Sequence, residues 1–281
     1  MFFTNGGTSK AIVFNSGTAF LQKTGASPFA LPQPASKVVF NKGSVFKPLS
    51  NTLLAFSGRT YANLEVNLAT FNQARTGIAL CTIDNIVMNH GLLSLDLTGG
   101  INITGSITVA NGASLSFNSA TNNFISFNGN TPQSISNYGN LSFGNNEAVV
   151  FNNATGITVN NDIVFNNAVT FTSGIVKMTN TAVLTLGASA NVAGASNASF
   201  VDGPVKKIGN TGFVFPVGKY IFGFQAYVPI EISASGTNTD EYTAEYIRSS
   251  AVAVSSTYTS GLDHVSGVDY WSLNRQVVPE L

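Results

Sequence analysis

Apolar side chains between residues 101 and 186 come in short pulses in which apolar and polar positions alternate, and most pulses end at Gly or Asn. The stretch GGINITGSITVANGASLSFN at residues 99–118 shows three such pulses: Ile101 and Ile103, then Ile107 and Val109, then Leu115 and Phe117. An alternation of period two over three to five residues predicts short strands with one buried face, and Gly and Asn mark the turns between them.

The spacing of these strands predicts a parallel β-solenoid. Residues 101–186 hold about twelve strands, or roughly seven residues per strand and turn, which lies in the repeat range of coiled β-structures. With three strands in each coil, one coil takes about twenty residues, and the Phe and Ile pulses become inward stacks. Two stretches echo one another, GSITVANGASLSF at 105–117 and TGITVNNDIVF at 155–165.

The two ends of the chain differ from this regular middle. Residues 1–90 mix short β-like runs with Gly, Asn and Pro, so we predict one solenoid over 1–198, less regular over 1–90 and regular over 91–198. After residue 198 charged residues return and the alternating runs lengthen. We predict a small antiparallel β-sandwich over 199–281 that caps the solenoid and is truncated at its C-terminus.

Composition narrows the function classes. The chain has 281 residues, 9% of them charged, and a formal net charge of zero, which disfavours nucleic acid as a partner. No apolar run is long enough for a membrane helix, so we expect no membrane insertion, and the N-terminus lacks the features of a signal peptide. The single cysteine, Cys81, excludes an internal disulfide, and we expect it to be a buried hydrophobic residue.

Three C-terminal segments resemble a known family: SFVDGPVKKIGNTGFVFPVGK at 199–219, YVPIEIS at 227–233 and GLDHVSGVDYWSLNR at 261–275. They are similar to the C-terminal part of large bacterial cell-surface proteins that use the type IX secretion route. The resemblance implies an adhesin with an Asn- and Gly-rich solenoid body, outside the cell or on the outer cell surface of a bacterium. It also implies further modules of the same polypeptide, so we expect the chain to be a fragment of a longer protein. The resemblance carries over no functional residues.

Candidate chemistry is sparse. A polysaccharide lyase or hydrolase on a β-helix needs clustered acids and bases, whereas the solenoid carboxylates are spread along the chain: Asp84, Asp96, Glu147 and Asp162. We therefore predict no catalytic residues. Neither His90 nor His264 has partners at metal-ligand spacing, so we also predict no metal site and no cofactor.

Two further features concern surfaces. Trp271 and the adjacent Tyr270 are the candidate contacts for a sugar, although a lone Trp in an alternating strand more often lies in a core. We expect Lys206 and Lys207 to protect an exposed strand edge from aggregation.

The sequence thus predicts a non-catalytic structural or adhesive protein: a rigid solenoid stalk that binds glycans or associates with its own copies. The alternative is a polysaccharide-active β-helix enzyme or a carbohydrate-binding module, which would depend on Asp84, Asp96 or Asp162.

Overall fold

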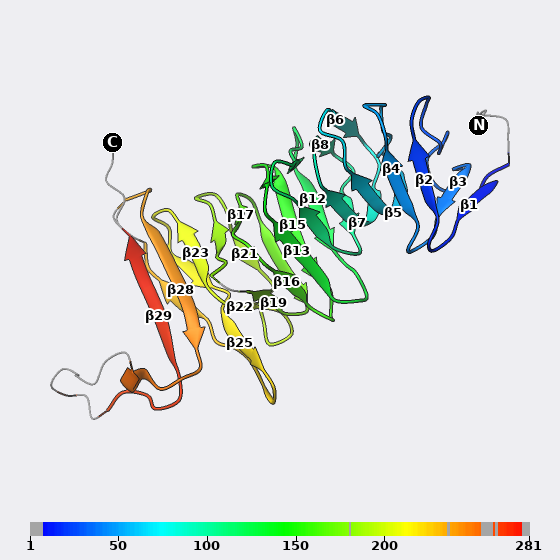
Figure 1. The fold of residues 1–281 in the computed structure, drawn as a ribbon. Coiled ribbons are helices and arrows are strands. Elements are labelled where there is room, and N and C mark those ends of the chain that lie inside the picture. Colours follow the sequence, from blue (N-terminus) through cyan, green and yellow to red (C-terminus); the bar gives the residue numbers. More distant parts are fainter. Residues whose placement is uncertain (1–7, 180, 235–236, 254–260, 262–263, 277–281) are drawn as a thin grey trace.

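The computed structural model of the protein describes residues 8–179, 181–234, 237–253, 261 and 264–276. Over these residues the fold is a parallel β-solenoid of about nine turns, followed by antiparallel strands (Figure 1). The one helical element among them is a single 3-10 turn, Ala251–Ala253. The all-β, solenoid prediction is therefore confirmed.

The N-terminal strands already belong to the rod. The first pair of parallel strands consists of β1 (Ile12–Phe14) and β3 (Val38–Phe40). The large sheet begins with four parallel strands stacked in order: β2 (Ala19–Gln22), β4 (Val45–Pro48), β5 (Thr60–Val66) and β7 (Cys81–Met88). The irregular sequence before residue 90 thus folds into coils that share a sheet with the regular ones.

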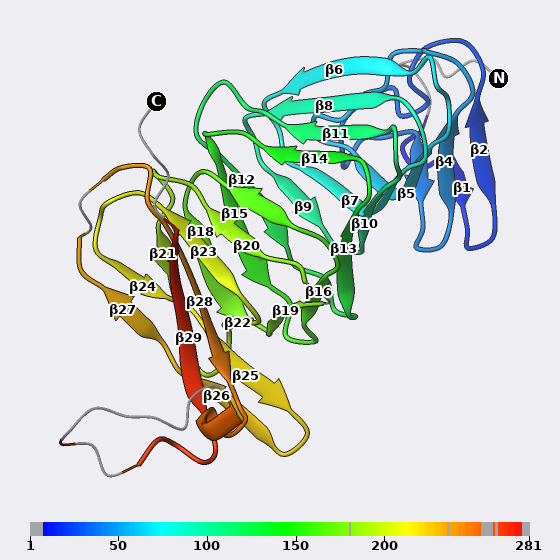
Figure 2. The ribbon, with the colours of Figure 1, turned by 60° about the vertical axis from the view of Figure 1, so that its left-hand side comes forward.

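After β7 each coil has three strands, and equivalent strands stack in parallel on three faces (Figure 2). The first face holds β9 (Ile101–Ile103), β12 (Asn123–Phe127), β15 (Glu147–Asn152), β18 (Val169–Ser173) and β21 (Val192–Ala193). The second holds β10 (Ile107–Val109), β13 (Gln133–Asn137), β16 (Ile157–Val159), β19 (Val176–Met178) and β22 (Val201–Asp202). The third holds β6 (Asn72–Gly77), β8 (Leu92–Leu97), β11 (Ser114–Phe117) and β14 (Asn140–Phe143), then β17 (Ile163–Phe165), β20 (Leu184–Leu186) and β23 (Val205–Ile208).

This arrangement confirms three strands per coil, and the described residues between 101 and 186 form twelve strands, β9 to β20. The sequence echo is structural as well. The first halves of the two similar stretches form β10 and β16, which lie on the same face with β13 between them. Their second halves form β11 and β17 on the third face. The repeated text therefore marks equivalent positions in different coils.

A bend divides the first two faces. The first half of β7 pairs with β9 and the second half with β10, so a continuous strand in one coil becomes two strands in the next. The break falls at Gly105, where a Cβ atom would collide with the side chain of Asn85 and the carbonyl oxygen of Asp84. Glycine allows the chain to pass close to the preceding coil at this corner.

The interior consists of apolar stacks. Ile103, Phe127, Phe151 and Phe171 follow one another along the first face, and all four are buried. The rings of Phe127 and Phe151 are stacked with their centroids 5.7 Å apart. Burial of large apolar side chains is the main stabilising contribution of such stacks.

Uncharged polar side chains form a ladder along the corner between the first two faces. Asn85 donates its Nδ2 to Asn63 Oδ1 at 2.7 Å, and Asn63 donates its own Nδ2 to the carbonyl of Ser44 at 2.8 Å. In the following coils the amide of Ser106 donates to Asn85 Oδ1 at 2.6 Å, and the amide of Ser134 to Ser106 Oγ at 2.9 Å. The ladder joins consecutive coils and satisfies polar groups at each turn.

The parallel coils continue past residue 198 to β22 and β23, and antiparallel strands then cover the rod's end. The third face passes from β23 to β28 (Glu241–Ile247) and β29 (Tyr270–Gln276), both in antiparallel pairing. Two ribbons complete this part: β24 (Phe213–Phe215) with β27 (Ile230–Ile232), and β25 (Gly218–Ile221) with β26 (Phe224–Tyr227). The β25–β26 hairpin projects from the side of the rod (Figure 2).

Candidate functional site

Two of the solenoid carboxylates bind the backbone of a neighbouring coil. Asp96 Oδ1 accepts a hydrogen bond from the amide of Ala120 at 3.1 Å, and Asp162 Oδ1 accepts one from the amide of Val183 at 2.9 Å. In both cases the donor lies one coil further along the rod. These carboxylates satisfy turn amides that have no partner in their own coil.

Glu147 has the same role in a buried setting. Its side chain is only 1% exposed, its Oε1 accepts from the amide of Ser119 at 2.5 Å, and its Oε2 accepts from Asn123 Nδ2 at 3.2 Å. Burial raises the pKa of the Glu147 carboxyl, the two hydrogen bonds oppose this rise, and the charge of Asp96 adds to it. The solenoid thus brings Glu147 and Asp96 near one another, which their positions in the sequence did not indicate.

Asp84 lies in a hollow of about 350 Å³ on the rod surface that has both polar and apolar side chains, among them Lys42, Asn128 and Phe40. Its Oδ1 accepts from Thr104 Oγ1 at 3.1 Å and its Oδ2 from Asn85 Nδ2 at 3.3 Å. Asp162 lines a different hollow, with asparagine and threonine side chains. The structure therefore does not bring Asp84 and Asp162 together as an acid and base pair.

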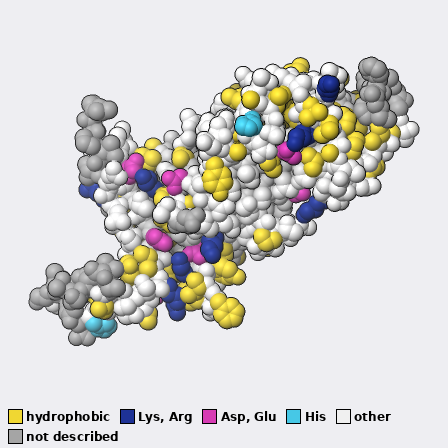
Figure 3. Space-filling view, viewed as in Figure 1, with side chains coloured by type: hydrophobic (Ala, Val, Ile, Leu, Met, Phe, Trp, Pro, Cys, Tyr) yellow, Lys and Arg dark blue, Asp and Glu magenta, His cyan; other side chains and the backbone are white. Residues whose placement is uncertain are grey.

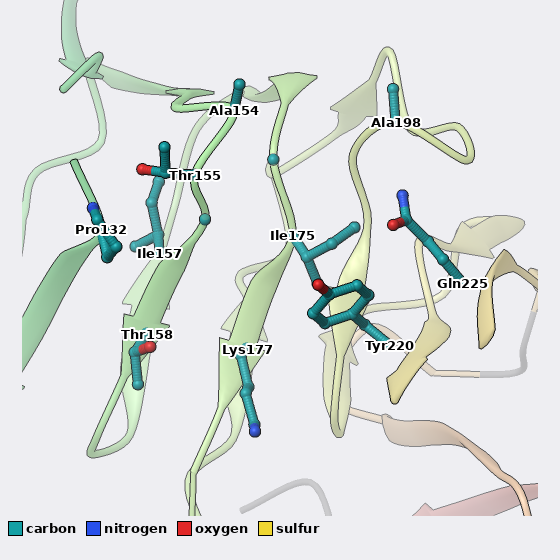
Figure 4. A pocket seen from close by; sticks show the side chains of 12 residues that line it. Pro132, Ala154, Thr155, Ile157, Thr158, Ile175, Lys177, Ala198, Tyr220 and Gln225 are labelled. Atoms are coloured by element: carbon teal, nitrogen blue, oxygen red, sulfur yellow. The ribbon is translucent and has the colours of Figure 1, made fainter. Parts of the chain in front are cut away.

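A third hollow, here called the furrow, runs beside the β25–β26 hairpin (Figure 4). It has a volume of about 230 Å³, and small or short side chains from four successive turns form its floor: Pro132, Ala154, Thr155, Gly156, Gly174 and Ala198. The side chains of Tyr220 and Gln225 from the hairpin form one wall, and Lys177 of β19 lies at one end. The furrow thus combines an aromatic ring, a cation and amide groups in one concave surface.

Specific contacts hold the hairpin against the rod. Gln225 Nε2 donates to the carbonyl of Asn197 at 2.6 Å, and the amide of Tyr227 donates to Asn197 Oδ1 at 2.8 Å. On the other strand, Lys219 Nζ lies 2.9 Å from Asp202 Oδ1. The wall of the furrow is therefore anchored on both strands of the hairpin.

Trp271 and Tyr270, the predicted sugar contacts, do not form one aromatic surface. They are consecutive residues of β29, so their side chains point to opposite faces of the sheet. Trp271 is 44% exposed, packs against Tyr246 with ring centroids 5.6 Å apart, and donates its Nε1 to the carbonyl of Val228 at 3.0 Å. It therefore lies at the edge of the core rather than inside it, and neither residue lines the furrow.

The prediction for the two adjacent lysines is wrong for Lys207. Its side chain is buried, and its Nζ donates to the carbonyls of Gly187, Ala188 and Ile208 at 2.7, 2.9 and 2.9 Å. Burial lowers the pKa of this ammonium. Lys206 points to the other side of β23, where its Nζ lies 2.7 Å from Glu241 Oε2. Strand alternation assigns the two lysines to different faces, and β28 covers the edge that was expected to be open.

Other candidate groups take structural positions. Cys81 is fully buried, as predicted, and burial raises the pKa of its thiol. In the part of the chain that the structure describes, no three His, Cys, Asp or Glu side chains form a group able to hold a metal ion. Among the same residues, no helix has the length and apolar character needed to cross a membrane.

Comparisons with protein-family models, with curated proteins and with solved structures gave no match. The furrow and the polar surface of the solenoid are therefore interpreted from their geometry alone.

Proposed function

We propose that this protein is a non-catalytic structural or adhesive protein, a rigid solenoid stalk that binds glycans or associates with its own copies at the outer surface of a bacterium. The observation that carries the proposal is the use of the solenoid carboxylates. Asp84, Asp96, Glu147 and Asp162 all accept hydrogen bonds from donors in a neighbouring coil or turn, so they hold the coils together.

The surface of the rod also supports this proposal. From residue 101 to 176 the charged residues are Glu147 and Asp162, and most of the middle of the rod is uncharged in the space-filling view (Figure 3). Outward positions carry Asn, Ser and Thr, which offer both donors and acceptors. Such a surface suits the hydroxyl groups of a polysaccharide, or the same surface on a second copy.

A second candidate, a polysaccharide-active enzyme, rests on the hollow around Asp84. A largely buried carboxylate there lies near Lys42, and a carboxylate in a concave surface is a common general acid or base. The absence of a second carboxylate among the residues that line this hollow favours the adhesive function.

One set of measurements separates the two functions. The purified chain is tested for binding to a panel of neutral and acidic polysaccharides, for release of reducing ends from them, and for assembly by sedimentation and negative-stain electron microscopy. The adhesive function predicts binding or assembly without product release. Product release that Asp84→Asn abolishes would establish the enzyme instead, and the absence of binding, assembly and turnover together would overturn the proposal.

A further inference from the structure

The floor of the furrow beside the β25–β26 hairpin contains two glycines in a left-handed backbone conformation. Gly156 and Gly174 lie at consecutive turns with φ angles of 91° and 83°. A Cβ atom on Gly174 would collide with the carbonyl oxygen of Asn153. These glycines thus allow the backbones of successive coils to lie close together at this corner.

An aromatic ring forms the wall of the furrow. The side chain of Tyr220 is 51% exposed, although the residue is anchored, because its amide donates to Asp202 Oδ2 at 3.3 Å. Figure 4 shows the ring beside the strand that carries Ile175 and Lys177. A half-exposed ring beside a hollow offers a flat apolar face, on which the C–H face of a sugar ring can pack.

A cation without a counterion lies at the end of the furrow. Lys177 is exposed, and its neighbours in the parallel register are Thr158 and Asp202. Asp202 is buried and already paired with Lys219. Burial raises the pKa of the nearby Glu245 carboxyl, the charge of Lys219 opposes this rise, and the charge of Asp202 adds to it. Among the described residues no carboxylate lies within ion-pair distance of Lys177. Its ammonium is therefore available for an anionic group of a ligand.

Polar groups complete the site. The furrow is also lined by the hydroxyls of Thr155 and Thr158 and by the Gln225 amide, which the carbonyl of Asn197 holds in place through Nε2. Hydroxyls and an amide oxygen match the ring hydroxyls of a sugar.

We propose that the furrow binds one residue of an acidic polysaccharide, with the sugar ring on Tyr220 and the hexuronate carboxylate on Lys177 Nζ. This inference rests on the proposed glycan-binding function and assigns to it both a site and a ligand class. It differs from the uncharged solenoid surface, which offers no group that selects a carboxylate.

The test uses isothermal titration calorimetry with three acidic probes, tetragalacturonate, tetramannuronate and tetraguluronate, each beside its carboxyl-reduced neutral counterpart. We expect at least one acid to bind at least tenfold more tightly than its neutral counterpart. Tyr220→Ala and Lys177→Gln should each weaken that binding at least tenfold, and Tyr220→Phe should retain most of it. Tyr138→Ala and Lys23→Gln change exposed residues outside the furrow and should leave the affinity unchanged.

Three results would overturn the inference. Equal affinity for an acid and its neutral counterpart would remove the role of Lys177. Binding that Tyr220→Ala and Lys177→Gln leave unchanged would move the ligand to another surface, while the glycan-binding function would survive. If none of the three acids binds, the assignment fails, and the neutral polysaccharide and assembly measurements then decide the proposed function separately.

Discussion

The middle of the rod and the C-terminal part use different means to satisfy their polar groups. Between β5 and β13 uncharged ladders join the coils, such as Asn63 with Asn85 and Asn85 with Ser106, and Asp84 and Asp96 accept hydrogen bonds from uncharged donors. After residue 198 ion pairs join the strands: Lys206 with Glu241, Lys219 with Asp202, and Arg275 with Asp240.

The difference follows from the sequence repeat together with strand direction. In a parallel stack built from a repeat, equivalent positions of successive coils lie side by side, so a charge in the repeat meets the same charge about 4.8 Å away. Amides and hydroxyls both donate and accept, and they can therefore bond to their own kind. Antiparallel strands bring unrelated positions together, so β23 and β28 can place Lys206 near Glu241. Charge is thus compatible with the C-terminal part, whereas like charges at equivalent positions are unfavourable in the repeated body. Parallel coils accept an ion pair where neighbouring positions differ, as for Lys47 of β4 and Glu65 of β5.

The largest loss of stability is expected when the buried Lys207 ammonium of the C-terminal part is removed. Lys207→Met should leave the carbonyls of Gly187, Ala188 and Ile208 without their donor and lower the free energy of unfolding by about 3 kcal/mol, because buried unpaired acceptors are costly. The matched control is Lys206→Met, which removes a partly exposed ion pair and should cost less than about 1 kcal/mol. Urea unfolding measures both, and equal losses would refute the structural role of Lys207.

The next largest loss of stability is expected when the uncharged ladder is interrupted at Asn85. Asn85→Asp removes the Nδ2 donor to Asn63 and places a second carboxylate beside Asp84, so we expect a loss of about 2 kcal/mol at neutral pH. Acidification should restore part of it, because protonation removes the charge. Thermal unfolding at pH 4 and pH 7 checks this, with exposed Asn122→Asp as the control. A variant as stable as the parent at both pH values would contradict the ladder's contribution.

A smaller loss of stability is expected when like charges are placed at neighbouring positions of parallel strands. Thr82 and Asn102 are direct neighbours in the parallel register. The double variant with Thr82→Lys and Asn102→Lys should be about 1 kcal/mol less stable than the one with Thr82→Lys and Asn102→Glu, because like charges repel across adjacent strands. Salt at 1 M should reduce this difference by screening. A difference that is absent at low salt would show that charge repulsion does not limit the repeat.

The smallest effect concerns Glu147, whose carboxyl pKa is raised in the folded protein. The folded state then binds more protons than the unfolded state between the ordinary and the raised pKa, so stability should fall as pH rises through that window. Glu147→Gln should flatten this slope and be more stable than the parent above the window. In the variant, the amide of Asn123, whose Oδ1 has no partner in the described structure, can turn to accept from the new Nε2. Urea midpoints from pH 4 to pH 8 check the slope, and identical slopes would exclude Glu147 as its source.

Much of the fold could be predicted from the chain alone. Alternating pairs such as Ile101 with Ile103 and Ile107 with Val109 define strand faces, and Gly and Asn mark the turns. These signals are local, because the inward or outward direction of a side chain depends only on its place in its own strand. The number of strands between residues 101 and 186 and the three strands per coil followed from that spacing.

The furrow could not be predicted in the same way. Its floor comes from four successive turns, and its wall comes from a hairpin that Asn197 and Asp202 hold against the rod. Only Tyr220 carried a local signal, as an aromatic residue near a Gly turn, and the sequence interpretation chose Trp271 and Tyr270 instead. Contacts across coils depend on register, and a degenerate repeat does not specify register.

The sequence by itself determined the strands, their inward faces and the scarcity of charge, since each is a property of neighbouring residues. Tertiary structure decided which coils share a stack, that Lys207 is buried while Lys206 is paired at the surface, and that Tyr220 and Lys177 line one hollow. The physical reason is distance along the chain. Alternation acts within a few residues, whereas a ladder, a buried ammonium or a binding site needs residues that only the stacking of complete coils brings together.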